Sequence, residues 1–276
     1  MPDVAADPEQ LQRAKGRAAV AMVAGSRGRA VLADLYQQGS AKAILPRVDG
    51  GAAEVVFLNT SGGLTGGDRL DYALCLGAGV RATATTQTAE RAYRSARGVA
   101  RAEVRLRVGP AGWLDWLPQE TILFDGAALE RQVTVDLDEG AGCLFLESVI
   151  LGRHAMGETV TGLRFRDSRM IRRGGQPVWA EPLLIDSRVL HRAGSAALLG
   201  CARALATLAL VHPHAGDRLA ALRAVLDEPG VESGASALDG RLILRMLAHD
   251  GLPLRRQILR ALAVLRAGPP PLVWQR

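Results

Sequence analysis

Several acidic side chains stand in apolar segments of the chain, where their chemistry depends on what surrounds them. Glu147 lies in CLFLESVILG, Asp186 follows PLLI, Asp115 stands between two tryptophans and Asp68 closes a glycine-rich turn. A carboxylate in a dry interior is costly unless it is paired. Pairing with arginine would make these residues structural bridges. If they instead line a hydrated internal passage, a metal cation could bind weakly to each carboxylate in turn and so move along the row.

Two histidines form the only close pair in the sequence, His212 and His214, separated by Pro213. Proline favours an extended backbone, and an extended backbone points alternate side chains to the same side. Two imidazoles placed in this way could share a transition-metal ion. The sequence offers no evident third ligand, so an ordinary surface turn remains the alternative.

Nucleotide-binding and nucleophilic motifs do not fit the sequence. The glycine-rich turn of residues 62–68 ends in an aspartate where a phosphate-binding loop needs Lys followed by Ser or Thr. Neither Ser148 nor Ser187 has the GxSxG setting of a hydrolase serine. We therefore expect no enzyme and no firmly bound cofactor. A hydrolase that uses Glu147 or Asp115 as general base remains the enzymatic alternative.

The bulk composition of the 276 residues indicates a folded protein with a net charge of +6. No apolar run approaches the length of roughly 20 residues that crosses a bilayer, so we expect no membrane segment. Three cysteines without a signal-like N-terminus indicate reduced thiols in the cytoplasm, and their apolar settings favour core packing. The arginines are scattered through alternating segments, which is typical of a solvated sheet face. The second interpretation of these arginines is a basic surface that binds an acidic protein, and the third is nucleic-acid binding.

The elements that must position these residues are mainly short strands. Residues 1–15 are predicted to be a mobile tail, and residues 16–276 a single domain. A strand–turn–strand unit recurs with its turn glycine at Gly79, Gly112 and Gly142, which indicates stacked β units over a shared core. Near the C-terminus, the spacing of apolar residues predicts two helices, over 216–227 and 253–267. Segments 197–211 and 241–249 fit either a helix or a strand.

Several strings, in order along residues 20–274, resemble the UreD (UreH) family of urease accessory proteins. The strings are GGLTGGD, TTQTAERAYRS, PQETILFDGA, the segment from ES to GE, and the C-terminal PPPLVW. The chain departs from the family pattern before the glycine turn, where Thr60 and Ser61 stand instead of Pro-Pro. The resemblance implies a β-helix-like stack of strands in one large domain with two α-helices near the C-terminus. It also favours strands for residues 204–211 and 242–247.

The resemblance further implies a non-enzymatic scaffold for urease maturation in the cytoplasm. Such a scaffold binds the urease apoprotein and the accessory protein UreF, which recruits the GTPase UreG for nickel insertion. Ni²⁺ is then cargo in transit, and the C-terminal helices with the PPPLVW tail are the candidate surface for UreF.

An internal tunnel is also implied by the resemblance. Six residues fall in matching motifs and are predicted to line the tunnel or to support its wall: Asp68, Thr85, Thr86, Gln87, Glu147 and Glu158. His212 and His214 remain weak metal candidates outside these motifs.

Overall fold

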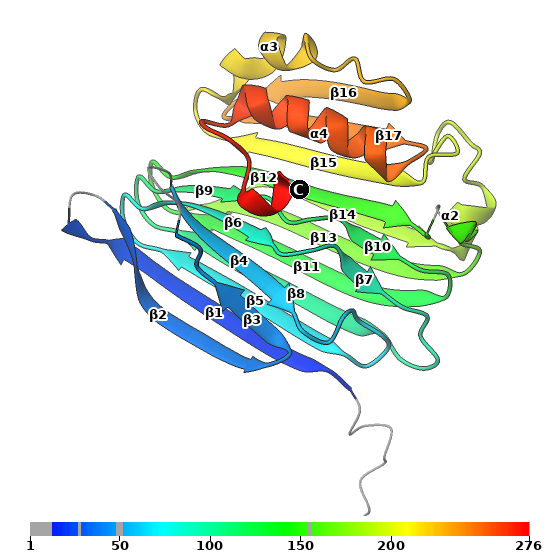
Figure 1. Ribbon diagram of the computed structural model, residues 1–276. Coiled ribbons are helices and arrows are strands. Elements are labelled where there is room, and N and C mark those ends of the chain that lie inside the picture. Colours follow the sequence, from blue (N-terminus) through cyan, green and yellow to red (C-terminus); the bar gives the residue numbers. More distant parts are fainter. Residues whose placement is uncertain (1–12, 27–28, 48–51, 154–155, 276) are drawn as a thin grey trace, which may run out of the picture.

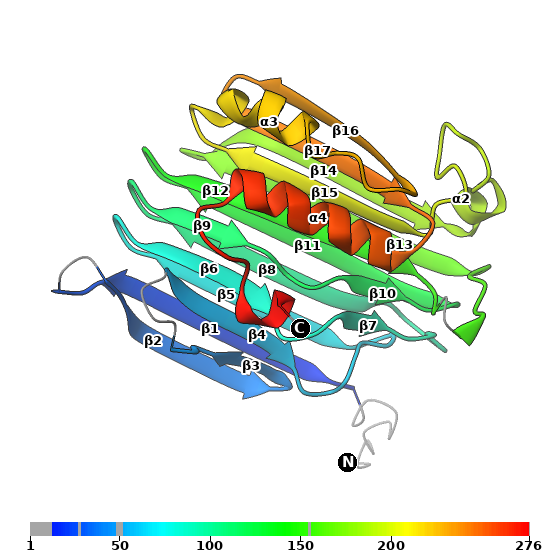
Figure 2. The same ribbon diagram turned by 45° about the horizontal axis from the view of Figure 1, so that its top comes forward.

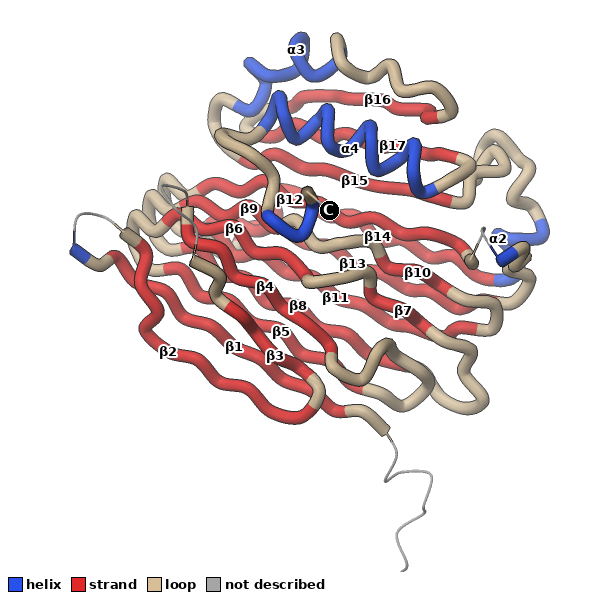
Figure 3. The backbone as a smooth tube through the Cα atoms, in the orientation of Figure 1, coloured by secondary structure: helices blue, strands red, loops and turns tan. Residues whose placement is uncertain are grey.

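A computed structural model describes residues 13–26, 29–47, 52–153 and 156–275. Strands make up 52% of the structure, and they form two sheets that face each other (Figure 1). The predicted tail, residues 1–15, lies mostly outside the described residues, and Lys15 already belongs to the first strand. Helices are few, and most of them lie in the C-terminal third of the chain (Figure 3). The mainly β fold is therefore confirmed.

The seven-stranded sheet has the order β14, β13, β11, β8, β5, β1, β2, and its five central strands run parallel. Its strands are β1 (Lys15–Ala24), β2 (Ala30–Gly39), β5 (Arg69–Leu76), β8 (Ala100–Val108), β11 (Ala127–Leu137), β13 (Leu163–Arg173) and β14 (Gln176–Asp186).

The ten-stranded sheet has the main order β16, β17, β15, β12, β9, β6, β4, β3; β10 pairs with β12, and β7 pairs with β10. Its strands are β3 (Ala41–Ile44), β4 (Ala53–Asn59), β6 (Arg81–Thr86), β7 (Glu90–Ala92), β9 (Trp113–Trp116), β10 (Thr121–Leu123), β12 (Gly142–Leu151), β15 (Ala204–Val211), β16 (Val231–Leu238) and β17 (Arg241–Ala248).

The predicted repeat is a β-solenoid-like stack of about four turns. Each repeat carries the chain from the seven-stranded sheet through a tight turn into the ten-stranded sheet, as in β5 to β6, β8 to β9 and β11 to β12. The turns stack by hydrogen bonds: the N–H of Gly79 donates to the carbonyl of Pro110 at 2.8 Å, and that of Ala111 donates to Glu139 at 2.9 Å. Gly79 has φ of +68°, which glycine adopts without strain.

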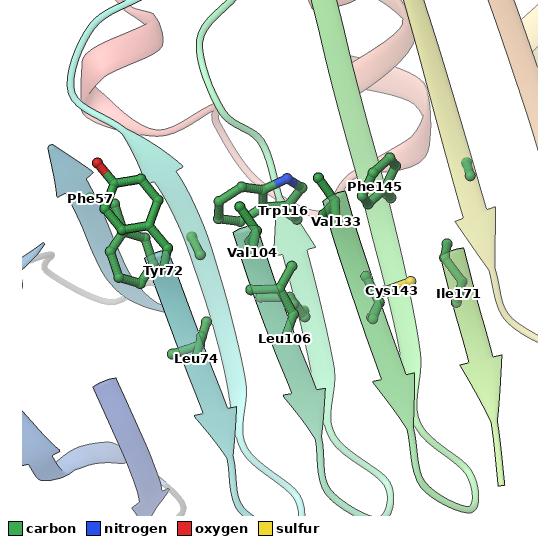
Figure 4. Packing of buried hydrophobic residues seen from close by; sticks show 14 of the residues in the cluster. Phe57, Tyr72, Leu74, Val104, Leu106, Trp116, Val133, Cys143, Phe145 and Ile171 are labelled. Carbon is green, nitrogen blue, oxygen red and sulfur yellow. The ribbon is translucent and has the colours of Figure 1, made fainter. Parts of the chain in front are cut away.

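The main core fills the space between the sheets. Alternate residues of each strand point inward, so in-register residues of adjacent strands form apolar rows such as Leu74, Leu106, Val135 and Ile171. Figure 4 shows this packing from close by. The outward positions between them carry exposed arginines, including Arg105, so the predicted solvated sheet face is confirmed.

A second core lies between the outer face of the ten-stranded sheet and the C-terminal helices (Figure 2). The helix predicted over 253–267 is α4 (Gly251–Leu265), whose first turn is capped by the Asp250 carboxylate. The helix predicted over 216–227 is shorter, a 3-10 turn η3 (Ala215–Arg218) followed by α3 (Leu219–Arg223). After it, Asp227 and Glu228 form ion pairs with Arg260 of α4.

The remaining elements settle the ambiguous segments and correct one expectation. Both ambiguous regions contain strands, β15 and β17, as the resemblance implied. Two short elements were not foreseen, α2 (Ser187–His191) and η4 (Leu272–Trp274). Core packing was expected for all three cysteines but holds only for Cys143, because Cys75 falls on an outward position of β5 and Cys201 lies in a loop.

Candidate functional site: a paired ion row between the sheets

Glu147 points into the space between the two sheets, where its carboxylate is almost completely buried. It shares the inward side of β12 with Phe145 and Val149 of the main core. The Arg131 guanidinium of β11 lies 2.6 Å from one carboxylate oxygen, and the indole N–H of Trp116 donates to the other at 2.9 Å. Arg131 also donates to the hydroxyl of Thr121 at 2.9 Å. The structure therefore gives Glu147 the arginine partner that a buried carboxylate requires.

The pairing continues from Arg131 across the seven-stranded sheet. Arg131 holds Asp167 of β13 with two bonds, of 3.0 and 2.5 Å, and Arg169 holds the same carboxylate at 2.7 Å. Arg169 reaches Glu181 of β14 at 3.3 Å, and Arg245 of β17 binds Glu181 at 2.6 Å. Three carboxylates and three arginines thus alternate. We call Glu147, Arg131, Asp167, Arg169, Glu181 and Arg245 the ion row.

The ion row runs from a dry interior to solvent. Glu147, Asp167 and Arg169 are each at most 1% exposed, whereas the side chain of Arg245 is 60% exposed. The Thr207 hydroxyl adds a bond to Glu181 at 2.6 Å near the exposed end. This gradient makes the Glu181–Arg245 end the part of the row that solutes can reach.

Burial and charge act against each other on the carboxyl groups of the row. Burial raises the pKa of Glu147, and the charge of Arg131 offsets only part of that effect. Burial also acts to raise the pKa of Asp167, but Arg131 and Arg169 outweigh it and hold the pKa below its ordinary value. Of the two carboxyl groups, that of Glu147 therefore protonates more readily than that of Asp167.

Glu90 is a half-buried carboxylate that was not among the predicted site residues. Its partners are the side-chain amide of Asn59, at 3.3 and 3.4 Å, and the backbone N–H of Arg91 at 3.0 Å. Burial raises its pKa to about 7. Its strand β7 pairs with β10, where Glu90 lies opposite Thr121, the residue that bonds to Arg131. The mostly polar residues 87–91, which follow β6, were the sequence signal that could have identified it.

Asp68 and Glu158 fix loops outside the ion row. The Asp68 carboxylate accepts the backbone N–H groups of Ala14 and Thr65, both at 2.8 Å, and so closes the glycine-rich turn. The Glu158 carboxylate accepts from the backbone N–H groups of Asp125 and Arg153 and from the Arg153 side chain. Both residues therefore hold neighbouring loops in place.

Thr85, Thr86 and Gln87 are not brought together with Glu147. In β6, Ala82 and Ala84 face the core between the sheets, so Thr85 points to the opposite face of the same sheet. Its hydroxyl donates to the carbonyl of Leu117 at 2.6 Å. The Thr86 hydroxyl accepts the N–H of Gln119, and Gln87 is exposed. Thr85 therefore lies on the face of the sheet that the C-terminal residues cover, since Trp274 donates to the same carbonyl.

That outer face is covered by the C-terminal strap, which we define as residues 266–275. The Arg266 guanidinium donates to Asp115 at 2.7 Å and to Thr83 at 2.8 Å. Glu54, Thr83 and Asp115 lie in register across β4, β6 and β9. The strap therefore closes over a polar row that is separate from the ion row.

Trp274 anchors the end of the strap. It is 3% exposed, and its indole N–H donates to the same Leu117 carbonyl that accepts from Thr85. The Arg255 guanidinium lies 4.6 Å from its ring centroid. The C-terminal tail is thus part of the folded structure.

His212 and His214 lie at the surface turn after β15, with ring centroids 5.6 Å apart. The Nδ1 atom of His212 already accepts the backbone N–H of His214, and its ring packs on Trp113. Within the described residues, no group of three or more His, Cys, Asp or Glu side chains could hold a metal ion. No helix of the described part is both long and apolar enough to span a membrane.

Geometry and charge together define a class of protein: a two-sheet β-solenoid with an ion-paired interior and a strapped outer face. A model of the family described as UreD urease accessory protein matches residues 14–275. Proteins named Urease accessory protein UreD are similar over nearly their whole length. One from Cereibacter sphaeroides is 62% identical over 96% of both chains, and one from Paracoccus denitrificans is 56% identical over 97% of this chain and 94% of its own. One from Rhizobium leguminosarum is 45% identical over 98% of both.

The chain therefore belongs to the UreD family of urease accessory proteins. The predicted resemblance is confirmed at the level of the family.

Proposed function

We propose that this chain is a cytoplasmic scaffold that binds the urease apoprotein and joins UreF and UreG for GTP-dependent nickel insertion. Membership of the UreD family supports a role in urease maturation and is the observation that carries the proposal. The scaffold has no catalysis of its own in this proposal. Nickel is its cargo, and the chain holds no resident cofactor.

The ion row is the proposed internal route for the cation. Carboxylate oxygens suit a divalent cation held only in transit. Each carboxylate of the row is bound by an arginine, so an entering cation must take the place of a guanidinium rather than fill an empty site.

The Glu147→Gln variant tests the route. Glutamine keeps the shape and can still accept from Trp116, but it removes the charge that attracts a cation. We expect unchanged assembly with urease and its accessory proteins and a several-fold lower nickel content of the urease. The matched control is Glu139→Gln on an exposed turn. Normal nickel loading with Glu147→Gln would exclude the route through the ion row while leaving the scaffold role intact.

Neither alternative function gains support from the geometry. The exposed arginines that suggested nucleic acid are paired with carboxylates along the outer sheet face, as in Arg105 with Glu103 and Arg164 with Glu130. Asp115 and Glu147, the general bases of the hydrolase alternative, are both bound by arginines.

A further inference from the structure

Strand β2 departs from the burial pattern of the fold. Every residue from Val31 to Gly39 is exposed, although four of them are large and apolar or aromatic. The exposed fractions are 42% for Val31, 45% for Leu32, 37% for Leu35 and 44% for Tyr36. A strand in a two-layer sheet protein ordinarily buries one face against the other layer. The ladder of hydrogen bonds to β1 holds β2 in place, and packing contributes little.

The register shows which side of β2 lacks a cover. Leu32 pairs with Met22 and Leu35 pairs with Val20, and both partners point into the main core. A register shift in β1–β2 keeps both leucines on this inner side. The inner side faces the place where the ten-stranded sheet would continue.

The ten-stranded sheet ends before it reaches this place. Its last strand, β3, has four residues, whereas β2 has ten. In β3, Ala41 and Ala43 face the core, so this short strand covers only a few residues of the seven-stranded sheet. Figures 1 and 2 place β2 at the end of the molecule away from α3 and α4. The sandwich therefore lacks part of its second layer at this end.

The chain segments that form this end of the molecule are basic. Six cationic residues lie in the described part of residues 13–47: Arg13, Lys15, Arg17, Arg29, Lys42 and Arg47. Asp34 is the only acidic residue in that described part. A second copy of the chain would bring like charges together, which disfavours self-association. The exposed side chains are mostly aliphatic, which suits a protein surface better than the stacked bases of a nucleic acid.

We propose that the overhang, defined as Leu32 and Leu35 on the uncovered inner side of β2, is the docking surface for an acidic partner protein. The partner supplies an apolar segment bordered by carboxylates and so completes the missing layer of the sandwich. This inference rests on the proposed function, since the partner is then a component of urease maturation. It assigns that component to the end of the molecule opposite the C-terminal helices.

The test measures binding of the full chain to purified urease apoprotein and to purified UreF, each alone. The variant carries Leu32→Ser and Leu35→Ser, which change exposed side chains and leave the core intact. The control is Leu184→Ser on β14, 52% exposed at the other edge of the same sheet. We expect at least tenfold weaker binding of one of the two proteins by the double variant and a change of less than twofold with the control.

A charge reversal separates the acidic partner from other occupants. Arg29→Glu should weaken the same complex at low salt, whereas Arg188→Glu in α2, which follows the strand at the other edge of the sheet, should not. Unchanged binding of both proteins by the double leucine variant would overturn the inference. A loss confined to self-association in sedimentation, or confined to binding of a DNA duplex, would also overturn it. A wild-type chain that binds neither protein would instead refute the proposed function, so the two failures are distinguishable.

Discussion

Arg131 is the residue on which the ion row depends, and its replacement by methionine gives the sharpest stability prediction. Methionine fills a similar volume without charge, so Glu147 keeps only the Trp116 N–H and Asp167 keeps only Arg169. Removing one partner of a buried ion pair typically costs about 3–5 kcal/mol, because it leaves a charge uncompensated. A domain whose free energy of unfolding is well above about 5 kcal/mol can lose about 3–5 kcal/mol and still fold. We expect Arg131→Met to lower the free energy of unfolding by about 3–5 kcal/mol at pH 7.

A double-mutant cycle isolates the pair. Glu147→Gln alone should cost about 1–2 kcal/mol, since Arg131 retains Asp167 and Thr121. Adding Glu147→Gln to Arg131→Met removes the orphaned charge and should recover about 1–3 kcal/mol relative to additivity. The surface control is Arg107→Met, whose exposed pair with Asp138 should be worth at most about 1 kcal/mol.

The assay is urea unfolding followed by tryptophan fluorescence, repeated from pH 4 to pH 8. The orphaned Glu147 of Arg131→Met has a raised pKa, so its protonated form is favoured in the folded state. The deficit of the variant should therefore be smallest at low pH and grow as the pH rises through that raised pKa. A cost below about 1 kcal/mol at pH 7, or additive single and double variants, would refute the reasoning.

Three further predictions concern other parts of the molecule. Burial raises the pKa of Glu90 to about 7, so ionisation of this carboxyl group opposes folding. The contribution of the protonated Glu90 to the free energy of unfolding is fully present below the ordinary glutamate pKa and is lost as the pH rises through about 7. Glu90→Gln should therefore raise the thermal midpoint at pH 8 and leave it unchanged at pH 4, a contrast that Glu139→Gln should not show. Trp274→Ala should cost about 3–5 kcal/mol and speed tryptic cleavage of the strap; an unchanged melting curve would mean that the tail does not anchor the fold. Burial raises the pKa of the Cys143 thiol to about 12, so iodoacetamide should label the other two cysteines in the native protein and Cys143 only after unfolding.

Local patterns in the sequence predict most of the fold. The turn glycines repeat at an interval set by one coil of the stack, and strand alternation follows a period of two. The helix over 216–227 is predicted too long because apolar spacing continues after Arg223, where α3 ends and the chain turns towards α4, with Asp227 and Glu228 bonding to Arg260. Such contacts join residues more than thirty positions apart, so the local spacing of residues does not predict them.

The candidate site is less accessible to sequence reasoning. The apolar setting of Glu147 predicts either an arginine partner or a passage, but the identity of Arg131 follows only from the register between coils. Thr85 and Glu147 lie on opposite faces of one sheet because Ala84 takes the inward position of β6. The pair of Asp115 and Arg266 joins residues 151 positions apart, so only the three-dimensional fold reveals it.

The central claim, a scaffold role in urease maturation, is tested most directly by deleting this chain alone. Urease subunits, UreF and UreG would be produced together with and without the tagged chain, and the nickel content of the purified urease would be measured. The account predicts that the partners co-elute with the tagged chain and that urease made without it lacks nickel and activity. Fully loaded, active urease in the absence of the chain, with nothing eluting alongside it when present, would contradict the account.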